Sequence, residues 1–493
     1  MKNYPLVYEL NTRCWLRDLG DLAGKPVKLG QVPAREIERI ASLGFTHVWL
    51  MGVWETGPRS RAIAREDKAL DRSCRIALPD LEEEDFSGSP FAVAAYRVDR
   101  ELGGETGLKT FRTLLKKKGL KLILDFVPNH VGLDHAWLET HPERFVHKLE
   151  PAPETFRIDT AAGPMWVAHG KDPNFAAWLD TVQIDYRRPD ARAAVIEDLK
   201  TIASLCDGVR CDMAMLLLND VFLQTWQGFP CIEPPPATEF WARAIQELRV
   251  VRKDFLFLAE AYWDLEGQLQ ELGFDYAYDK RLYDYLVARD YPAVQSHLTM
   301  AAPEFLDRSC HFLENHDEQR IASVLAPGEH RAAALLLLVA PGMRLIYEGQ
   351  MEGACLQNRV HLSRRPEEPV HPEIRDLYER LLAGLAGTAV GRGSWRVLTP
   401  RSAWNDNGSF RNLVVIAWQA KAPEFDLAVV NLAPHTCQAY VPLGTEDLSQ
   451  TNWSLVDLLG EERYERNGDD LAEQGLYLDV GPHAAQVFHF KPI

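Results

Sequence analysis

The chain has 493 residues, which is long enough for an α/β barrel of ordinary size together with one or two smaller modules. With 46% hydrophobic and 25% charged residues, its composition is that of a folded globular enzyme and excludes the disordered and membrane-spanning classes. The formal net charge of -17 argues against binding to nucleic acid or to an anionic membrane surface, since both attract basic proteins, and a neutral substrate fits better.

Short runs rich in Val, Ile, Leu and Phe alternate with longer stretches of helical periodicity along most of the chain. Eight such runs are predicted as strands: Leu6–Leu10, Thr46–Met51, Lys121–Phe126, Gly208–Asp212, Phe255–Glu260, Phe274–Tyr278, Cys310–Glu314 and Arg344–Glu348. Strands that are each followed by a helix pair in parallel and are covered on both faces. Eight such units predict a closed (β/α)8 TIM barrel, whose active site is built at the carboxyl ends of the strands.

Three of the segments that follow predicted strands are unusually long, and long loops on this face shape a substrate site. They extend from about Gly52 to Gly104, from Val131 to about Ala177 and from Met213 to about Glu239. The second is predicted to form a small inserted subdomain, at about residues 131–177, between the third strand and its helix. The acidic run Glu82–Asp85 in the first is expected to be a solvated loop.

From about Gly391 the pattern changes to short alternating segments without helices between them, such as Leu413–Trp418 and Leu427–Asn431. This pattern predicts a C-terminal antiparallel β-sandwich. We therefore divide the chain into a catalytic barrel over residues 1–390, including the inserted subdomain, and a β-sandwich over residues 391–493.

The cysteines and the apolar segments indicate the compartment. The eight cysteines are scattered, with no CxxC pair and no dense framework of the secreted kind. The segment MKNYPLVYELNTRCW reaches charged residues before any apolar stretch of signal-peptide length, so we expect the chain in the cytoplasm. The most apolar segment, Ala332–Ala340, is too short to cross a bilayer and is expected to be a buried helix leading into a strand.

Carboxyl groups stand at the ends of three predicted strands, where a barrel keeps its catalytic groups: Asp212, Glu260 and Asp317. Arg210 and Asp212 are two residues apart on one strand, so their side chains point the same way and the guanidinium is expected to keep the carboxylate ionised. Glu260 follows an apolar run, which disfavours charge and should raise its pKa. Glycoside hydrolysis with retention requires one ionised and one protonated carboxyl group, here Asp212 as nucleophile and Glu260 as acid/base. Asp317 adds a negative charge suited to an oxocarbenium-like transition state.

Four strand-end segments carry a wider resemblance: Asp125-Phe126-Val127-Pro128-Asn129-His130, Gly208-Val209-Arg210-Cys211-Asp212, Leu258-Ala259-Glu260 and Glu314-Asn315-His316-Asp317. In this order, and on these strands, they resemble the sequence regions of the α-amylase superfamily, glycoside hydrolase family 13. The resemblance spans the chain, since residues 341–349 resemble the family's eighth strand and the final segment resembles its C-terminal sandwich. It implies that Arg210 supports the nucleophile and that His130 and His316 bind the sugar in the reacting subsite.

The chain also departs from the family pattern. Where relatives place a tyrosine that stacks on the reacting sugar, this chain offers Phe91, so stacking is kept and the hydroxyl is lost. Many relatives carry a lysine and a histidine after the nucleophile, where this chain has Met215 and Leu216. Either these two residues form an apolar acceptor site, which would favour transfer to a sugar, or they pack the start of a barrel helix. Trp263 is expected either to stack on a sugar or to fill the core.

The resemblance also bears on calcium, which many relatives bind through that histidine and an aspartate. Here Gln183 and Leu216 stand at the ligand positions, and Asn129 alone cannot hold calcium, which needs several oxygen ligands. We therefore expect no structural calcium, no other metal and no cofactor.

The function that these residues favour is a retaining α-glycosidase acting on α-glucosidic bonds of short α-glucans or maltooligosaccharides by double displacement. An α-glucan transglycosylase using the same residues stays open, because both share the first half-reaction. A catalytically silent carbohydrate-binding or partner subunit is a third reading, against which the joint presence of Asp212, Glu260 and Asp317 argues. The expected partner is an oligosaccharide or α-glucan substrate, with linkage, substrate length and oligomeric state open.

Overall fold

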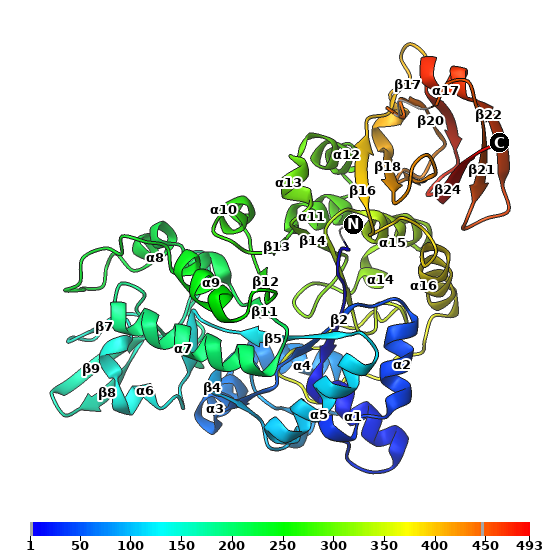
Figure 1. Cartoon of the computed structure of the whole chain (residues 1–493). Coiled ribbons are helices and arrows are strands. Elements are labelled where there is room, and N and C mark those ends of the chain that lie inside the picture. The colour runs from blue at the N-terminus through cyan, green and yellow to red at the C-terminus, as the bar shows by residue number, and fades with distance from the viewer. Residues whose placement is uncertain (1–2, 445–447) are drawn as a thin grey trace.

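A closed barrel forms the centre of the molecule (Figure 1). The computed structural model describes residues 3–444 and 448–493. In this part of the chain, parallel strands close in the order β1-β15-β14-β13-β12-β11-β5-β2. They are β1 Leu6–Asn11, β2 His47–Met51, β5 Lys121–Phe126, β11 Gly208–Cys211, β12 Leu256–Ala259, β13 Tyr276–Tyr278, β14 Ser309–Phe312 and β15 Met343–Tyr347. Each predicted strand is present, and the predicted TIM barrel is confirmed.

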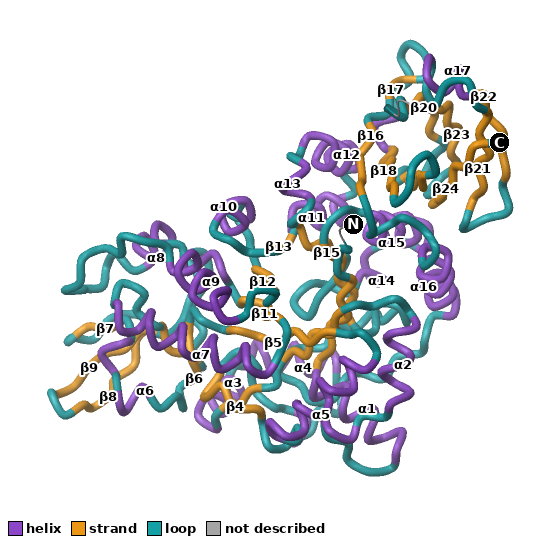
Figure 2. Tube along the Cα trace, viewed as in Figure 1, coloured by secondary structure: helices purple, strands orange, loops and turns teal. Residues whose placement is uncertain are grey.

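Helices cover the outside of the barrel (Figure 2). The longer ones are α1 Thr12–Ala23, α2 Ala34–Ser42, α5 Gly104–Lys117, α7 Pro189–Leu205, α9 Phe240–Val251, α11 Lys280–Ala288, α12 Tyr291–Met300, α15 Pro327–Val339 and α16 Pro372–Leu385. Shorter ones are α10 Glu266–Glu271, α13 Pro303–Leu306 and α14 Ile321–Val324. Because the strands are covered on both faces, they are near-continuous apolar runs, and β2 and β15 are buried at every position. The predicted buried helix is α15, which leads into β15 as expected.

The segments that follow the strands on the catalytic face contain further elements. After β2 come β3 Trp54–Thr56, α3 Pro58–Glu66, α4 Lys68–Ala77 and β4 Val93–Val98. After β5 come β6 His130–Gly132, α6 Trp137–Thr140, β7 His147–Lys148, β8 Thr155–Thr160, β9 Gly163–Ala168 and β10 Thr181–Gln183. The sheet β7-β9-β8 lies in the segment where an inserted subdomain was predicted, and the pair β10-β6 adjoins it, while the bounds of about 131–177 stay a prediction. After β11 come a short 3-10 turn over Ala214–Leu217 and α8 Asn219–Thr225.

One long catalytic-face segment was not predicted. Between β15 and α16 the chain runs without a helix or strand over residues 349–371. Sequence periodicity gives no signal for such a segment, because it has neither helical nor strand spacing.

The C-terminal segment folds into two antiparallel sheets, drawn in orange and red in Figure 1. One has the order β16-β18-β19-β24-β21-β22 and the other β17-β20-β23. Their strands are β16 Ser394–Leu398, β17 Arg401–Ser402, β18 Leu413–Gln419, β19 Phe425–Asn431, β20 Cys437–Val441, β21 Asn452–Asp457, β22 Arg463–Asn467, β23 Leu476–Val480 and β24 Ala485–Pro492, with the short helix α17 Gly468–Glu473. The predicted sandwich is confirmed, and the exact domain boundary at residue 390 stays a prediction.

Two further features concern the whole chain. The eight cysteines are all unpaired. Within the described residues, no helix combines the length and the apolar character that crossing a bilayer requires.

Candidate functional site

Two carboxyl groups share one arginine at the carboxyl ends of β11 and β12. Arg210 lies on β11 and is fully buried, and its Nη1 contacts Oδ1 of Asp212 at 2.5 Å. Its Nη2 contacts Oε2 of Glu260 at 2.8 Å. Asp212 is 6% exposed and Glu260 3% exposed, so the pair is held in a nearly dry setting. The contact predicted between Arg210 and Asp212 is present, and the arginine also reaches the second carboxyl group.

Glu260 is held from two further directions. Its Oε2 accepts the backbone N–H of Met213 at 2.6 Å, and its Oε1 accepts the hydroxyl of Tyr262 at 2.8 Å. Burial raises the pKa of Glu260 to about 7, with Asp212 adding to the rise and Arg210 opposing it. The predicted rise is therefore present, and near neutral pH this group is poised to give and take a proton.

Burial also raises the pKa of Asp212 above its ordinary value, although the contact with Arg210 opposes the rise. Arg210 thus favours the carboxylate, as predicted, without lowering the pKa below the usual range. The two carboxyl groups face the same cation, and in both the pKa rises because of burial while Arg210 opposes the rise.

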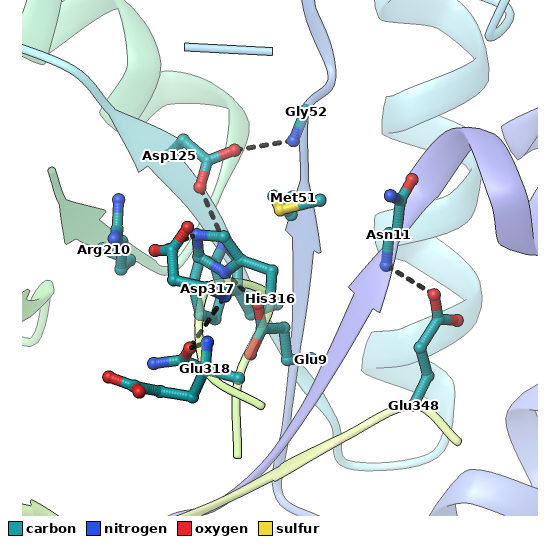
Figure 3. Close-up of polar contacts among 12 residues, drawn as sticks. Glu9, Asn11, Met51, Gly52, Asp125, Arg210, His316, Asp317, Glu318 and Glu348 are labelled. Atoms are coloured by element: carbon teal, nitrogen blue, oxygen red, sulfur yellow. Dashed lines mark hydrogen bonds and ion pairs between the residues drawn. The ribbon is translucent and has the colours of Figure 1, made fainter. Parts of the chain in front are cut away.

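On the other side of the site, one histidine lies between two carboxyl groups (Figure 3). Nδ1 of His316 contacts Oε1 of Glu9 at 2.5 Å, and Nε2 contacts Oδ2 of Asp317 at 3.0 Å. Burial opposes a charge on the ring, but Asp317 and Glu9 raise the pKa of His316 well above its ordinary value. Desolvation also opposes ionisation of Asp317, yet His316 holds the pKa of Asp317 below its ordinary value. Of the three predicted catalytic carboxyl groups, only Asp317 is open, with 48% of its side-chain surface exposed.

Phe91 joins these two halves of the site. Its ring stacks on the ring of His316, with centroids 5.4 Å apart and planes 29° from parallel. The guanidinium of Arg210 lies 5.4 Å from the centre of the same ring. Phe91 therefore contacts both halves of the site, and its role as a stacking surface for the reacting sugar stays a prediction.

Two buried carboxyl groups of the site, Asp125 and Glu9, were assigned no role from the sequence. Asp125 is fully buried at the end of β5 and accepts the indole N–H of Trp49 at 2.8 Å and the backbone N–H of Gly52 at 2.7 Å. Glu9 is equally buried on β1. A charged residue inside an otherwise apolar strand was the available signal for both, because burial of a carboxylate requires specific partners.

The two remaining predicted sugar-binding residues differ in position: the ring of His130 is hydrogen-bonded to the backbone of Phe91 and so borders the cluster, whereas Trp263 lies apart from it. His130 is 4% exposed and packs against Trp178 with ring centroids 5.0 Å apart, and burial lowers the pKa of His130 to about 4. Trp263 is 40% exposed and has a φ of 62°. In the described part of the chain, neither has a hydrogen bond or ring contact to Asp212, Glu260 or Asp317.

Met215 and Leu216 do not form an acceptor surface. Both are buried, at 0% and 3% exposure, and belong to the main hydrophobic core. The apolar-acceptor interpretation is therefore wrong, and the alternative of helix-start packing is confirmed. Only the burial of the side chains separates the two interpretations, because the sequence alone does not distinguish an apolar core residue from an apolar binding-site residue.

The residues at the family's calcium position do not fit the ion. The amide Nε2 of Gln183 donates to the backbone oxygen of Asn129 at 2.9 Å and to its Oδ1 at 3.1 Å. Oε1 of Gln183 accepts the Asn129 amide at 3.3 Å. A donor group thus occupies the side of Asn129 where a cation needs oxygen ligands. Among the residues that the structure describes, no group of three or more His, Cys, Asp or Glu side chains is placed to hold a metal ion.

Comparison with known proteins gives consistent similarities. The family model described as the catalytic domain of alpha amylase matches residues 34–369. Alpha-amylase MalA of Haloarcula japonica is 22% identical over 264 residues, which are 52% of this chain and 35% of the relative, so the match spans about a third of that protein.

Solved structures match over nearly the whole chain. A maltogenic alpha-amylase from Thermotoga neapolitana has a TM-score of 0.69 at 18% identity, with 99% of this chain and 98% of that chain covered. A debranching enzyme from Nostoc punctiforme has a TM-score of 0.66 at 15% identity, with 99% of this chain and 100% of that chain covered. At these identities the likeness shows the fold alone, and the two enzymes differ in activity.

Proposed function

Because residues 34–369 match the alpha-amylase catalytic domain, this chain belongs to that family of glycoside hydrolases, and we propose that it hydrolyses α-glucosidic bonds of short α-glucans or maltooligosaccharides with retention of configuration. In this proposal Asp212 is the nucleophile, Glu260 the acid/base and Asp317 the carboxylate that stabilises the transition state. The cytoplasm stays the predicted compartment.

The reaction proceeds in two displacements. A carboxylate oxygen of Asp212 bonds to the anomeric carbon while the bond from this carbon to the glycosidic oxygen breaks, and Glu260 delivers its proton to that oxygen. Water then attacks the anomeric carbon, Glu260 takes the water's proton, and the ester bond to Asp212 breaks. The ionised Asp317 faces the positive charge that develops on the sugar in both steps.

The observation that carries the proposal is the sharing of Arg210 by Asp212 and Glu260, at 2.5 and 2.8 Å. A single guanidinium that reaches both carboxyl groups holds them close together, as retaining enzymes require, whereas inverting enzymes keep room for a water between them. Burial gives the two groups different tasks, since the pKa of Glu260 near 7 allows it to carry the proton that the leaving oxygen needs.

Phe91 and His316 support the reacting sugar in this proposal, because the ring of Phe91 stacks on His316 of one half and faces Arg210 of the other. His130 borders the cluster through its hydrogen bond to the backbone of Phe91, whereas the proposed sugar contact of Trp263 depends on a substrate that reaches beyond the cluster. Met215 and Leu216 are core residues, so they no longer support transfer to a sugar acceptor.

A time course on maltotriose tests the proposal, with product lengths read by chromatography and the first-released anomer read by NMR. Initial release of the α-anomer with only shorter products is expected. Initial release of the β-anomer would refute the retaining mechanism, and products longer than the substrate would assign transfer instead of hydrolysis.

The Asp212→Asn variant ties this activity to the site. It should keep its melting temperature and lose turnover by about 10⁴-fold or more, because no covalent intermediate can form. Asp264→Asn is the matched control, since Asp264 also follows β12 on the catalytic face but is 70% exposed and pairs with Arg281. Near-normal activity in Asp212→Asn would exclude the assignment.

A further inference from the structure

Two segments on the catalytic face, far apart in the sequence, are joined into one wall. We call them the β2 loop, residues 57–92, and the β15 loop, residues 349–371. The backbone N–H of Ser87 donates to the His361 oxygen at 2.8 Å, and the N–H of Ser363 donates to the Asp85 oxygen at 2.8 Å. The rings of Phe86 and His361 stack with centroids 5.9 Å apart. Backbone pairing and ring stacking across the junction make the two loops one layer.

The wall has a hydrophobic core of its own, separate from that of the barrel. Leu362 of the β15 loop packs into a cluster of β2-loop residues: Ala64, Cys74, Ala77, Leu78, Leu81 and Phe86. Burial of apolar surface makes opening of the wall costly, because Leu362 and the β2-loop residues around it would be exposed to water. The wall is therefore a permanent part of the site's boundary.

Ion pairs lock the same junction. Arg364 of the β15 loop contacts Oδ2 of Asp85 at 2.6 Å and Oδ1 of Asp80 at 3.1 Å, and Arg17 contacts Asp85 at 2.9 Å. Arg364 is the main reason that the pKa of Asp85 is lowered to about 2. The expectation that the acidic run Glu82–Asp85 is a solvated loop is therefore wrong for Asp85, which is 2% exposed.

The wall contacts the backbone of Asp317. The side-chain amide of Gln357 donates to the backbone oxygen of Asp317 at 2.6 Å. Arg359 extends from the β15 loop to the β2 loop, where its Nε donates to Oγ of Ser73 at 2.5 Å. Within the described residues, the two Nη atoms of Arg359 have no hydrogen-bond partner. After His316 and Arg210, this guanidinium also helps to lower the pKa of Asp317, so it lies within electrostatic reach of that carboxylate.

The barrel order shows on which side of the substrate the wall stands. The wall rises from β2 and β15, which are the two neighbours of β1. Glu260 follows β12, which lies four strands from β1 in either direction and is therefore opposite it. The acid must lie beside the leaving oxygen. The leaving part of the substrate consequently extends toward β12, and the sugar that bonds to Asp212 faces the wall.

We propose that this wall ends the glycone side of the site directly behind the reacting sugar, so that the enzyme takes only the non-reducing end of a chain and removes one glucosyl unit at each cleavage. Arg359 binds hydroxyl groups of that terminal sugar through its two unused Nη atoms. This inference rests on the proposed retaining hydrolase and adds which end of the substrate that hydrolase uses.

A pair of substrates tests the inference with the unmodified enzyme. Maltoheptaose is compared with maltoheptaose whose non-reducing end carries an ethylidene bridge across O4 and O6, and the products are separated by chromatography. Glucose is expected as the first product of the free substrate, and the bridged one should react at least about 100-fold more slowly because the wall leaves no room for the bridge. Similar rates, or maltose and longer fragments as first products, would overturn the inference while leaving the retaining hydrolase intact. Absence of turnover on maltoheptaose and on maltotriose alike would instead refute the proposed function, and the inference with it.

Variants of Arg359 test its role at the terminal sugar. Arg359→Ala should lower kcat/KM for maltotriose about 10- to 100-fold, mostly through a higher KM, because charged hydrogen bonds to the sugar are lost. Arg359→Lys should recover part of that loss. Arg375→Ala is the matched control, since Arg375 is an exposed arginine on α16, the helix that follows the β15 loop. An unchanged kcat/KM in Arg359→Ala, with an unchanged melting temperature, would show that Arg359 does not contact the sugar.

Discussion

The two halves of the site each place one cation between two carboxyl groups, but the cations differ. On the β11–β12 side, Arg210 lies between Asp212 and Glu260, and all three side chains are buried. On the β14–β1 side, His316 lies between Glu9 and Asp317. Arginine keeps its charge at every pH at which proteins are stable, whereas the charge of histidine depends on its neighbours.

The two cations give the two halves of this buried site different tasks. Burial raises the pKa of both Asp212 and Glu260, and the fixed charge of Arg210 opposes the rise in each. Arg210 thus remains a charged partner for whichever of the two groups is ionised. On the other side, His316 owes its charge to the carboxylates that it holds, so the three groups form a unit that stabilises itself. Arg210 therefore tunes proton transfer, and His316 stabilises the fold and positions Asp317.

Replacement of Arg210 by lysine should break the first half and have the largest effect. A single ammonium cannot bind both carboxyl groups as the guanidinium fork does, so kcat/KM should fall about 100- to 1000-fold. In the wild type, kcat/KM should decline as pH rises through about 7, where Glu260 loses its proton. Because Arg210 lowers the pKa of Glu260, a lost contact should move this decline to higher pH.

The pH profile of kcat/KM measures this effect. Arg243→Lys is the control, since Arg243 pairs with Glu247 at 2.8 Å on the surface. A decline that stays at the wild-type pH in Arg210→Lys would mean that the arginine does not control the proton of Glu260.

Replacement of His316 by asparagine should break the second half and act mainly on stability. The shorter amide cannot reach Glu9, which is left as a buried carboxylate without its partner, at a cost of about 3–5 kcal/mol in free energy of unfolding. The folded-state pKa of His316 lies above 6.5, so its contribution is fully present below pH 6.5 and is lost as pH rises through the folded value. The difference between wild type and variant should therefore be larger at pH 6 than at alkaline pH.

Urea unfolding at several pH values measures this difference. His435→Asn, at an exposed histidine of the C-terminal sandwich, controls for the substitution itself. A difference that grows with pH would contradict the assigned role of His316.

Chelation should leave both halves unchanged and is the smallest expected effect. The amide of Gln183 bonds to both oxygens of Asn129, at the position where relatives bind calcium. EDTA should therefore shift the melting temperature by less than about 1 °C. A larger shift would require a metal ion that binds only the folded state and stabilises it. A large drop that calcium restores would show that an ion is bound.

Much of the fold was readable in the sequence because of local patterns. Strands covered on both faces need continuous apolar runs, and each of the eight runs became a barrel strand. Asp212 and Glu260 were readable as a pair because they follow consecutive strands, which are hydrogen-bonded neighbours in the barrel. Arg210 followed from strand spacing alone, since alternate residues point the same way.

Only the tertiary structure decided the remaining contacts, which join residues that barrel closure brings together. Glu9 and His316 are 307 residues apart, and they meet because the strand order places β1 two positions from β14. The wall depends on loops separated by most of the chain, with no periodicity to mark their contact. Whether Met215 lines a substrate or fills the core depends on what covers it. Local sequence pattern determines which segments become strands and helices, whereas burial and long-range pairing exist only once the barrel has closed.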